Sequence, residues 1–73
     1  MLTNQEHELV KQLEMAIFGS QRAVFGELFG LRFWVGDSGV EIVVGAPPGI
    51  TREDQERFFV EFGKRMITLQ ERV

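Results

Sequence analysis

The sequence contains no cysteine and no tyrosine, and only one histidine, one tryptophan and two prolines. Without cysteine the chain can form neither a disulfide nor a thiolate metal site, and a single histidine leaves a structural zinc site short of ligands. No apolar run approaches the roughly 18–20 residues that cross a bilayer as a helix. We therefore expect no disulfide framework, no metal site, no cofactor and no membrane-spanning segment.

Size and charge narrow the possibilities further. A chain of 73 residues predicts a single domain, 1–73, which is too small to bury a large core and often needs oligomerisation for stability. The 44% hydrophobic fraction, with seven phenylalanines, is typical of a folded globular protein. A net charge of −3 argues against a general nucleic-acid binder. The polar, acidic N-terminus does not resemble a signal peptide, so we expect a cytoplasmic protein.

The stretch Leu31–Val44 is predicted to form a two-stranded antiparallel hairpin that turns at Gly36–Gly39. Alternate apolar residues on each side of the turn would share one face: Leu31, Phe33, Val35, Val40, Ile42 and Val44. This pattern places Phe33 opposite Ile42. A register with a bulge at Gly39 would set Val35 against Glu41, and the apolar pattern disfavours it.

An N-terminal helix is predicted over about Asn4–Phe18, because Thr3 and Glu6 have the spacing of a capping box. The chain beyond it is ambiguous. The helix can continue with a kink, Ser20 can cap a second helix over Gln21–Phe29, or Ala23–Leu28 can be a strand. We favour a helix that is kinked or broken near Gly19, with Gly30 as its stop.

A C-terminal helix is predicted to follow the proline- and glycine-rich connector, with Thr51 as its N-cap. Apolar residues then repeat at helical spacing: Phe59, Phe62, Met66, Leu69 and Val73. Phe58, Val60 and Ile67 widen this apolar surface. The expected fold class is α+β, a small α-β-β-α domain whose helices cover one face of the sheet. We expect Phe59, Phe62 and Met66 to belong to the core.

The residues that catalysis requires are not grouped in the sequence. His7 stands between Glu6 and Glu8 on what reads as a solvated helix face, and Gly-Asp-Ser-Gly around Ser38 reads as a turn. The carboxylates Glu53, Asp54 and Glu56 are typical partners of a helix N-terminus. We predict no catalytic residue and a protein that is not an enzyme.

Two surfaces are candidate interfaces. The outward face of the hairpin carries Arg32, Trp34 and Val43, and a tryptophan beside an arginine is the composition of an interface hot spot. The alternative is that another segment covers this face and makes Trp34 part of the core. The second surface is the distal part of the C-terminal helix, with Met66, Leu69 and Val73, because Leu69 and Val73 extend beyond what a short hairpin covers.

The sequence thus predicts a small acidic protein–protein interaction module. We expect a homodimer that uses the C-terminal helix, acting as an inhibitor or accessory subunit of a larger assembly. The alternative function is a nucleic-acid-associated regulator that uses Arg32, Trp34 and the basic residues of the C-terminal helix, Arg57, Lys64 and Arg65. A third hypothesis is a small apolar ligand bound between the helices and the sheet.

Overall fold

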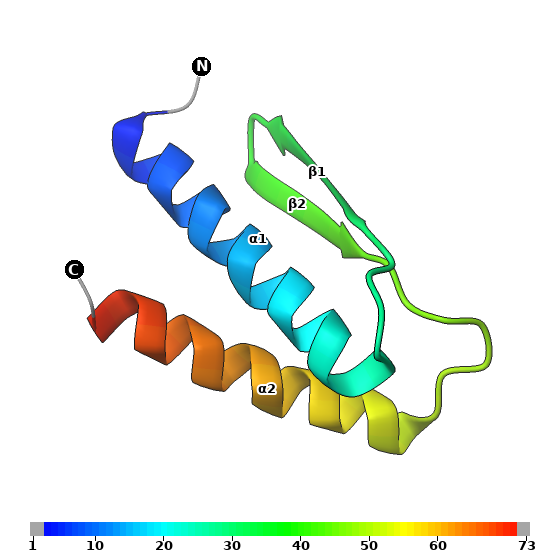
Figure 1. The fold of residues 1–73 in the computed structure, drawn as a ribbon. Coiled ribbons are helices and arrows are strands. Elements are labelled where there is room, and N and C mark those ends of the chain that lie inside the picture. Colours follow the sequence, from blue (N-terminus) through cyan, green and yellow to red (C-terminus); the bar gives the residue numbers. More distant parts are fainter. Residues whose placement is uncertain (1–2, 72–73) are drawn as a thin grey trace.

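The computed structural model describes residues 3–71, with the side chains of residues 35 and 40 left aside. Four elements follow one another along the chain: α1 (Asn4–Phe25), β1 (Leu31–Gly36), β2 (Gly39–Val44) and α2 (Arg52–Glu71) (Figure 1). The predicted α+β class and the α-β-β-α order are therefore confirmed. Val73, which was predicted to extend the C-terminal helix, lies outside the described residues.

The hairpin has the predicted register. Phe33 lies opposite Ile42, Leu31 opposite Val44 and Val35 opposite Val40, in an antiparallel two-stranded sheet. Gly36 pairs with Gly39 at the turn, where Gly39 has a φ of 130°, a backbone conformation that L-residues with side chains rarely adopt. Matching apolar patterns on the two strands were enough to exclude the bulged register.

The N-terminal helix is one continuous element, so the alternative in which it continues past Gly19 is confirmed and its expected end near Phe18 is wrong. The break near Gly19, the second helix over Gln21–Phe29 and the strand over Ala23–Leu28 are wrong as well. Ser20 does not cap a new helix, because its Oγ donates to the carbonyl oxygen of Ala16 at 2.6 Å, within the same helix. Gly19 does not end the helix either. A Cβ at this position would lie 2.8 Å from Nε of Arg65, so the glycine makes room for a side chain of α2.

Capping residues set the ends of the helices. Thr3 and Glu6 form the predicted capping box, each side chain accepting from the other residue's backbone N–H at 3.1 Å. Thr51 Oγ1 accepts from the N–H of Asp54, which caps α2. The stop of α1 is Gly26, in the left-handed region with φ 80°, rather than Gly30. Gly30 also has positive φ, 76°, but it lies in the connector to β1.

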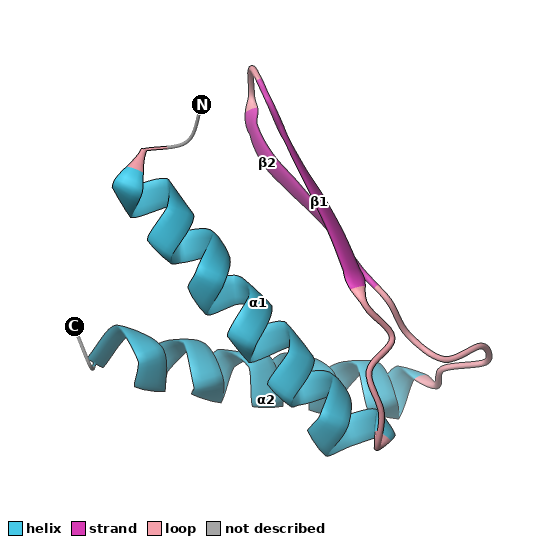
Figure 2. Ribbon diagram, turned by 45° about the horizontal axis from the view of Figure 1, so that its top comes forward, coloured by secondary structure: helices cyan, strands magenta, loops and turns pink. Residues whose placement is uncertain are grey.

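Figures 1 and 2 show the hairpin on one side of α1 and α2 on the other. The expectation that both helices cover one face of the sheet is therefore wrong. The reason is aromatic packing between the helices. Phe58 of α2 is buried and stacks on Phe25 of α1, with ring centroids 5.9 Å apart, and on Phe62 at 6.5 Å. The side of α2 that carries Phe58 and Phe62 is thus directed at α1, and α2 meets the hairpin only at its base, where Phe58 lines a groove with Val44.

The most buried residues lie mainly on one face of α1. Among the described residues, the buried apolar side chains are Ala16, Ile17 and Phe58, and two fully buried polar ones, Ser20 and Gln21, accompany them. Four of these five residues follow the i, i+4 spacing on α1, so this helix is the centre of the molecule. A buried polar side chain is costly unless it is hydrogen-bonded, and Gln21 therefore needs partners.

The amide of Gln21 finds these partners at the base of the hairpin. Its Nε2 donates to the carbonyl oxygens of Gly30 at 2.8 Å and Gly45 at 2.9 Å, and its Oε1 accepts from the N–H of Phe29 at 3.1 Å. Gly45 also donates its own N–H to Gly30 at 3.0 Å. A Cβ at Gly45 would overlap the carbonyl oxygen of Phe29, so this close approach requires glycine. One side chain thereby joins α1 to both strand ends.

Replacing Gln21 by Glu tests this junction with almost no change of shape. The variant loses both donors and turns a carboxylate oxygen toward two carbonyl oxygens, so we expect the free energy of unfolding to fall by about 3 kcal/mol or more. Such a loss is comparable to the total stability of a domain of this size. Urea unfolding followed by circular dichroism measures it.

The same change at Gln12, a half-buried position on α1, is the matched control. We expect Gln12→Glu to change the free energy of unfolding by about 1 kcal/mol or less. Equal losses for the two variants would contradict a special role of Gln21.

Candidate interaction surface

The outer face of the hairpin carries the first predicted site. Arg32 lies opposite Val43 and Trp34 opposite Glu41, which brings these four side chains to one face of the sheet. Trp34 and Val43 are each 49% exposed. A shallow depression on this face is lined by residues that include Phe29, Arg32, Trp34 and Val43. Trp34 is therefore a surface residue with apolar neighbours, and the alternative that it belongs to the core is wrong.

The opposite face of the hairpin is only partly covered, although the sequence predicted it as a core face. Phe33 and Val44 are each 37% exposed, and Leu31 and Ile42 are half-buried. This follows from the layer order, because α2 lies beyond α1 and approaches the sheet only at the base of the hairpin, near Val44. The hairpin is thus attached mainly at its base and presents apolar side chains on both faces.

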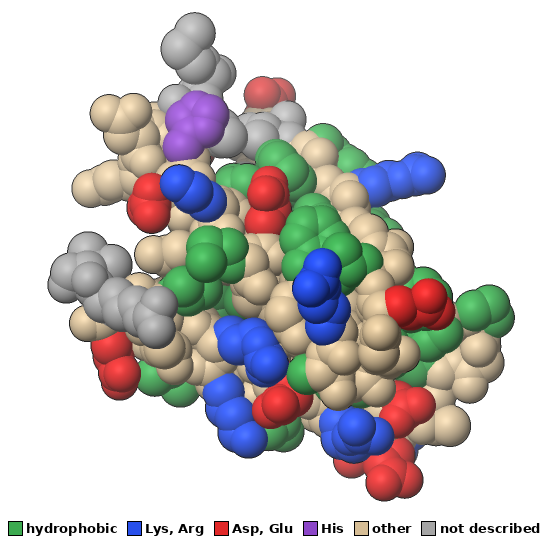
Figure 3. Space-filling view, viewed as in Figure 1, with side chains coloured by type: hydrophobic (Ala, Val, Ile, Leu, Met, Phe, Trp, Pro, Cys, Tyr) green, Lys and Arg blue, Asp and Glu red, His purple; other side chains and the backbone are tan. Residues whose placement is uncertain are grey.

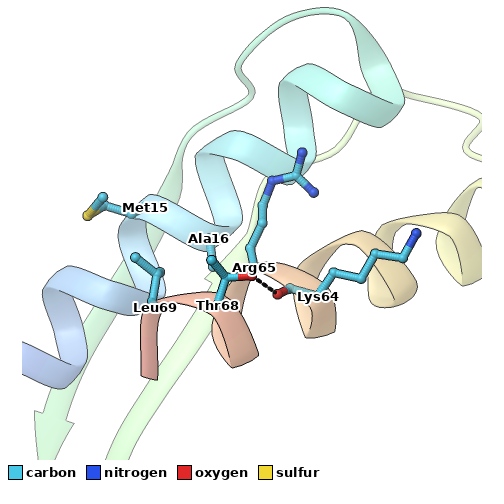
Figure 4. Close-up of a pocket in the computed structure, with 6 residues that line it drawn as sticks. All are labelled: Met15, Ala16, Lys64, Arg65, Thr68 and Leu69. Atoms are coloured by element: carbon cyan, nitrogen blue, oxygen red, sulfur yellow. Dashed lines mark hydrogen bonds between the residues drawn. The ribbon is translucent and has the colours of Figure 1, made fainter. Parts of the chain in front are cut away.

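The second predicted site, on the distal part of α2, is only partly exposed in the structure. Met66 and Leu69 are half-buried. Leu69 lines a groove together with Met15 and Ala16 of α1, as Figure 4 shows. Leu69 does lie beyond the hairpin, as expected, but α1 covers part of it. Val73, the third predicted residue of this site, is outside the described residues.

Sequence reasoning missed a separate apolar surface on α2. Phe59 is 70% exposed, Val60 56% and Ile67 59%, so the assignment of Phe59 to the core is wrong. The signal was present in the spacing. At 100° per residue, Phe58, Phe62 and Leu69 share the side that faces α1. Val60 and Ile67 fall on nearly the opposite side, and Phe59 lies between the two groups. Both sets have helical spacing, so the sequence alone predicts one broad apolar surface.

Charges on α2 largely neutralise one another. Arg57 lies 3.2 Å from Asp54, while Lys64 and Arg65 lie 3.3 Å and 3.6 Å from Glu61. The hydrogen bond and positive charge of Lys64, supported by Arg65, lower the pKa of Glu61 below its ordinary value. The stabilisation from this carboxylate is present above about pH 4.5 and is lost as the pH falls through the lowered pKa.

This charge arrangement bears on the nucleic-acid alternative. Phosphate binding requires basic side chains that are free to replace counterions along one face. The three basic residues predicted for that role on α2 are each paired with a carboxylate of the same helix. Figure 3 shows acidic and basic side chains interspersed over the face it presents. The pattern favours a solvated helix surface over a phosphate-binding one.

The side chains that could take part in catalysis or metal binding lie apart from one another. His7 is exposed in the first turns of α1, and Ser38 is exposed in the hairpin turn. At the start of α2, Glu56 is 3.5 Å from Arg52, an exposed pair along the helix. Across residues 3–71, no three His, Asp or Glu side chains gather in a way that could hold a metal ion.

The described part of the chain has no helix with both the length and the apolar character to cross a membrane. An apolar groove of about 250 Å³ lies where the base of the hairpin meets Phe25 and Phe58.

Comparison of the chain with protein-family models, with curated proteins and with solved structures found no match.

Proposed function

We propose that this chain is a non-enzymatic protein–protein interaction module that forms a homodimer and serves as an accessory subunit or inhibitor of a larger assembly. The observation that carries the proposal is the imbalance between buried and exposed apolar side chains. Among the described residues three apolar side chains are buried, whereas ten large ones are exposed. The exposed set is Leu9, Met15, Leu28, Phe33, Trp34, Val43, Val44, Phe59, Val60 and Ile67.

Scattered apolar side chains are normal on protein surfaces, but grouped ones mark binding sites. Here they group on the hairpin and along α2. A small chain that contains no cysteine, and therefore no disulfide, gains most from association, because a partner supplies the apolar burial that its own core lacks. The partner chemistry that fits these surfaces is therefore another protein.

The hairpin supports the same proposal by its backbone. A two-stranded sheet has an edge on each strand, and edges with unpaired N–H and C=O groups accept a further strand. The outer face adds Trp34 and Arg32, residue types that are enriched at binding hot spots. The hairpin therefore offers a partner both backbone hydrogen bonds and an anchoring aromatic ring.

Sedimentation equilibrium tests the homodimer. We expect the apparent mass to rise with concentration in the micromolar range, from the 8.4 kDa of one chain toward twice that value. An apolar interface should hold between low and high salt, because its free energy does not depend on screened charges. A mass of 8.4 kDa at every concentration would refute the homodimer.

Affinity capture with paired baits tests the role of the hairpin in a larger assembly. Wild-type chain and a Trp34→Ser variant are used on the same extract of the native host, and the captured proteins are quantified by mass spectrometry. We expect at least one protein to be retained by the wild type and depleted about tenfold or more with the variant, as for a hot-spot residue. Identical capture by the two baits would contradict binding through the outer face.

A further inference from the structure

A second apolar surface of α2, which we name the outer stripe, consists of Phe59, Val60, Gly63 and Ile67. Its three large side chains are 56–70% exposed, more than most apolar side chains of the described chain. The stripe lies on a different side of α2 from Phe58, Phe62 and Leu69. Helix α2 therefore has one apolar side that packs on α1 and a second that stays more than half exposed. At the edges of this second side, Phe59 borders a groove with Val44 and Ile50, and Val60 borders a groove with Ala23 and Val24.

Gly63 is the unusual member of the outer stripe. A glycine inside a helix is less favourable than alanine by about 1 kcal/mol, because it loses more backbone entropy on folding. Nothing in residues 3–71 requires it, since a Cβ at this position would meet none of their atoms within 4 Å. A glycine between two large exposed apolar residues lets the backbone of another helix approach closely, with side chains on each side of the contact.

We propose that the outer stripe binds the outer stripe of a second copy of this chain, with the two α2 helices antiparallel and crossing at Gly63. This inference rests on the homodimer proposed above and names its interface. In such a twofold arrangement, residues equally far before and after the crossing point face each other. Phe59 precedes Gly63 by four residues and Ile67 follows it by four. Each Phe59 therefore meets the Ile67 of the other copy, and the stripe is complementary to itself.

The charges beside the outer stripe agree with this pairing. In an antiparallel dimer the same flank of both helices meets, with the residue order reversed. On this flank the symmetric position is Lys64 rather than Gly63, so Arg57, seven residues before Lys64, comes close to Glu71 of the other copy, seven residues after it, and their charges are opposite. Arg57 pairs with Asp54 of its own helix at 3.2 Å, but its side chain stays 55% exposed and can reach a second carboxylate. Lys64 approaches Lys64 of the other copy across the twofold axis. Its ion pair with Glu61, at 3.3 Å, draws the ammonium group away from this axis and offsets its charge.

The proposed contact uses α2 and leaves the hairpin of each copy accessible. A helix of 20 residues is about 30 Å long, enough to align one antiparallel helix along the stripe. Because α1 lies between most of α2 and the hairpin, the four helices of the two copies form the centre of the dimer and the two hairpins lie outside it. Trp34, the single tryptophan, is not covered by this interface.

Two substitutions test the interface by sedimentation equilibrium and thermal unfolding. Ile67→Glu places a carboxylate in the apolar contact twice per dimer, and we expect the dissociation constant to rise by about a hundredfold or more. Gly63→Leu fills the crossing point and should separate the copies equally well. Leu is a much better helix former than Gly at this open position, so the Tm of the isolated monomer should rise.

Gly63→Leu is expected to weaken the dimer and to raise the Tm of the monomer. These opposite changes separate an interface effect from a folding effect, because a variant that is only destabilised would form less dimer and also have a lower Tm. Leu9→Glu, at a 46% exposed position of α1, is the matched control and should leave the dissociation constant within about threefold of the wild type. Emission of Trp34 should not shift as the wild type associates.

The outcomes distinguish this interface from the homodimer itself. A wild-type dimer that persists unchanged in both Ile67→Glu and Gly63→Leu overturns the outer-stripe contact while the homodimer stands, and a concentration-dependent blue shift of Trp34 emission then assigns the interface to the hairpin. A wild-type chain that stays monomeric refutes both. Loss of the dimer in the two α2 variants, with the Leu9→Glu dimer intact, supports the outer stripe.

Discussion

The side-chain amide of Gln21 is the contact on which the arrangement of this molecule depends. It is fully buried, and it donates to Gly30 and Gly45 while accepting from Phe29. These backbone groups lie just before β1 and just after β2, so one side chain holds both strands to α1. Because such groups are expensive to leave unpaired, the amide fixes where the hairpin leaves the helix. The apolar contacts between the hairpin and the helices are too few to do so, as the exposure of Phe33 and Val44 indicates.

Local features of the fold could be predicted from the sequence, and the arrangement of its layers could not. The capping box of Thr3 and the pairing of Phe33 with Ile42 depend on neighbours in the chain or on a simple alternation. The role of Gln21 depends on partners 8 to 24 residues away. In the sequence it is a polar residue after an ambiguous Gly-Ser pair. Its spacing from Ile17 does mark it as a member of the buried face of α1.

The candidate site was only partly predictable for a related reason. The outward position of Trp34 and Val43 follows from strand parity, and the structure places both on the surface. The position of Leu69 does not follow from any local pattern, because its neighbour is α1 rather than the sheet. Phe59 has the same helical spacing as true core residues. Which of two apolar sides of α2 is covered depends on the aromatic stack of Phe25 and Phe58, a long-range contact. The proposed dimer would use the uncovered side and would present two hairpins to one assembly, which raises avidity without new contacts.

Hydrogen exchange measured by NMR on the wild-type chain tests the central role of Gln21 most directly. The side-chain amide protons of Gln21 and the backbone amide of Phe29 can be followed as separate signals. If the buried amide holds the hairpin, these protons exchange only when the domain opens, and they are as well protected as the backbone amides of Ile17 and Phe58. Exchange as fast as that of the exposed hairpin turn at Asp37 and Ser38 would contradict the account.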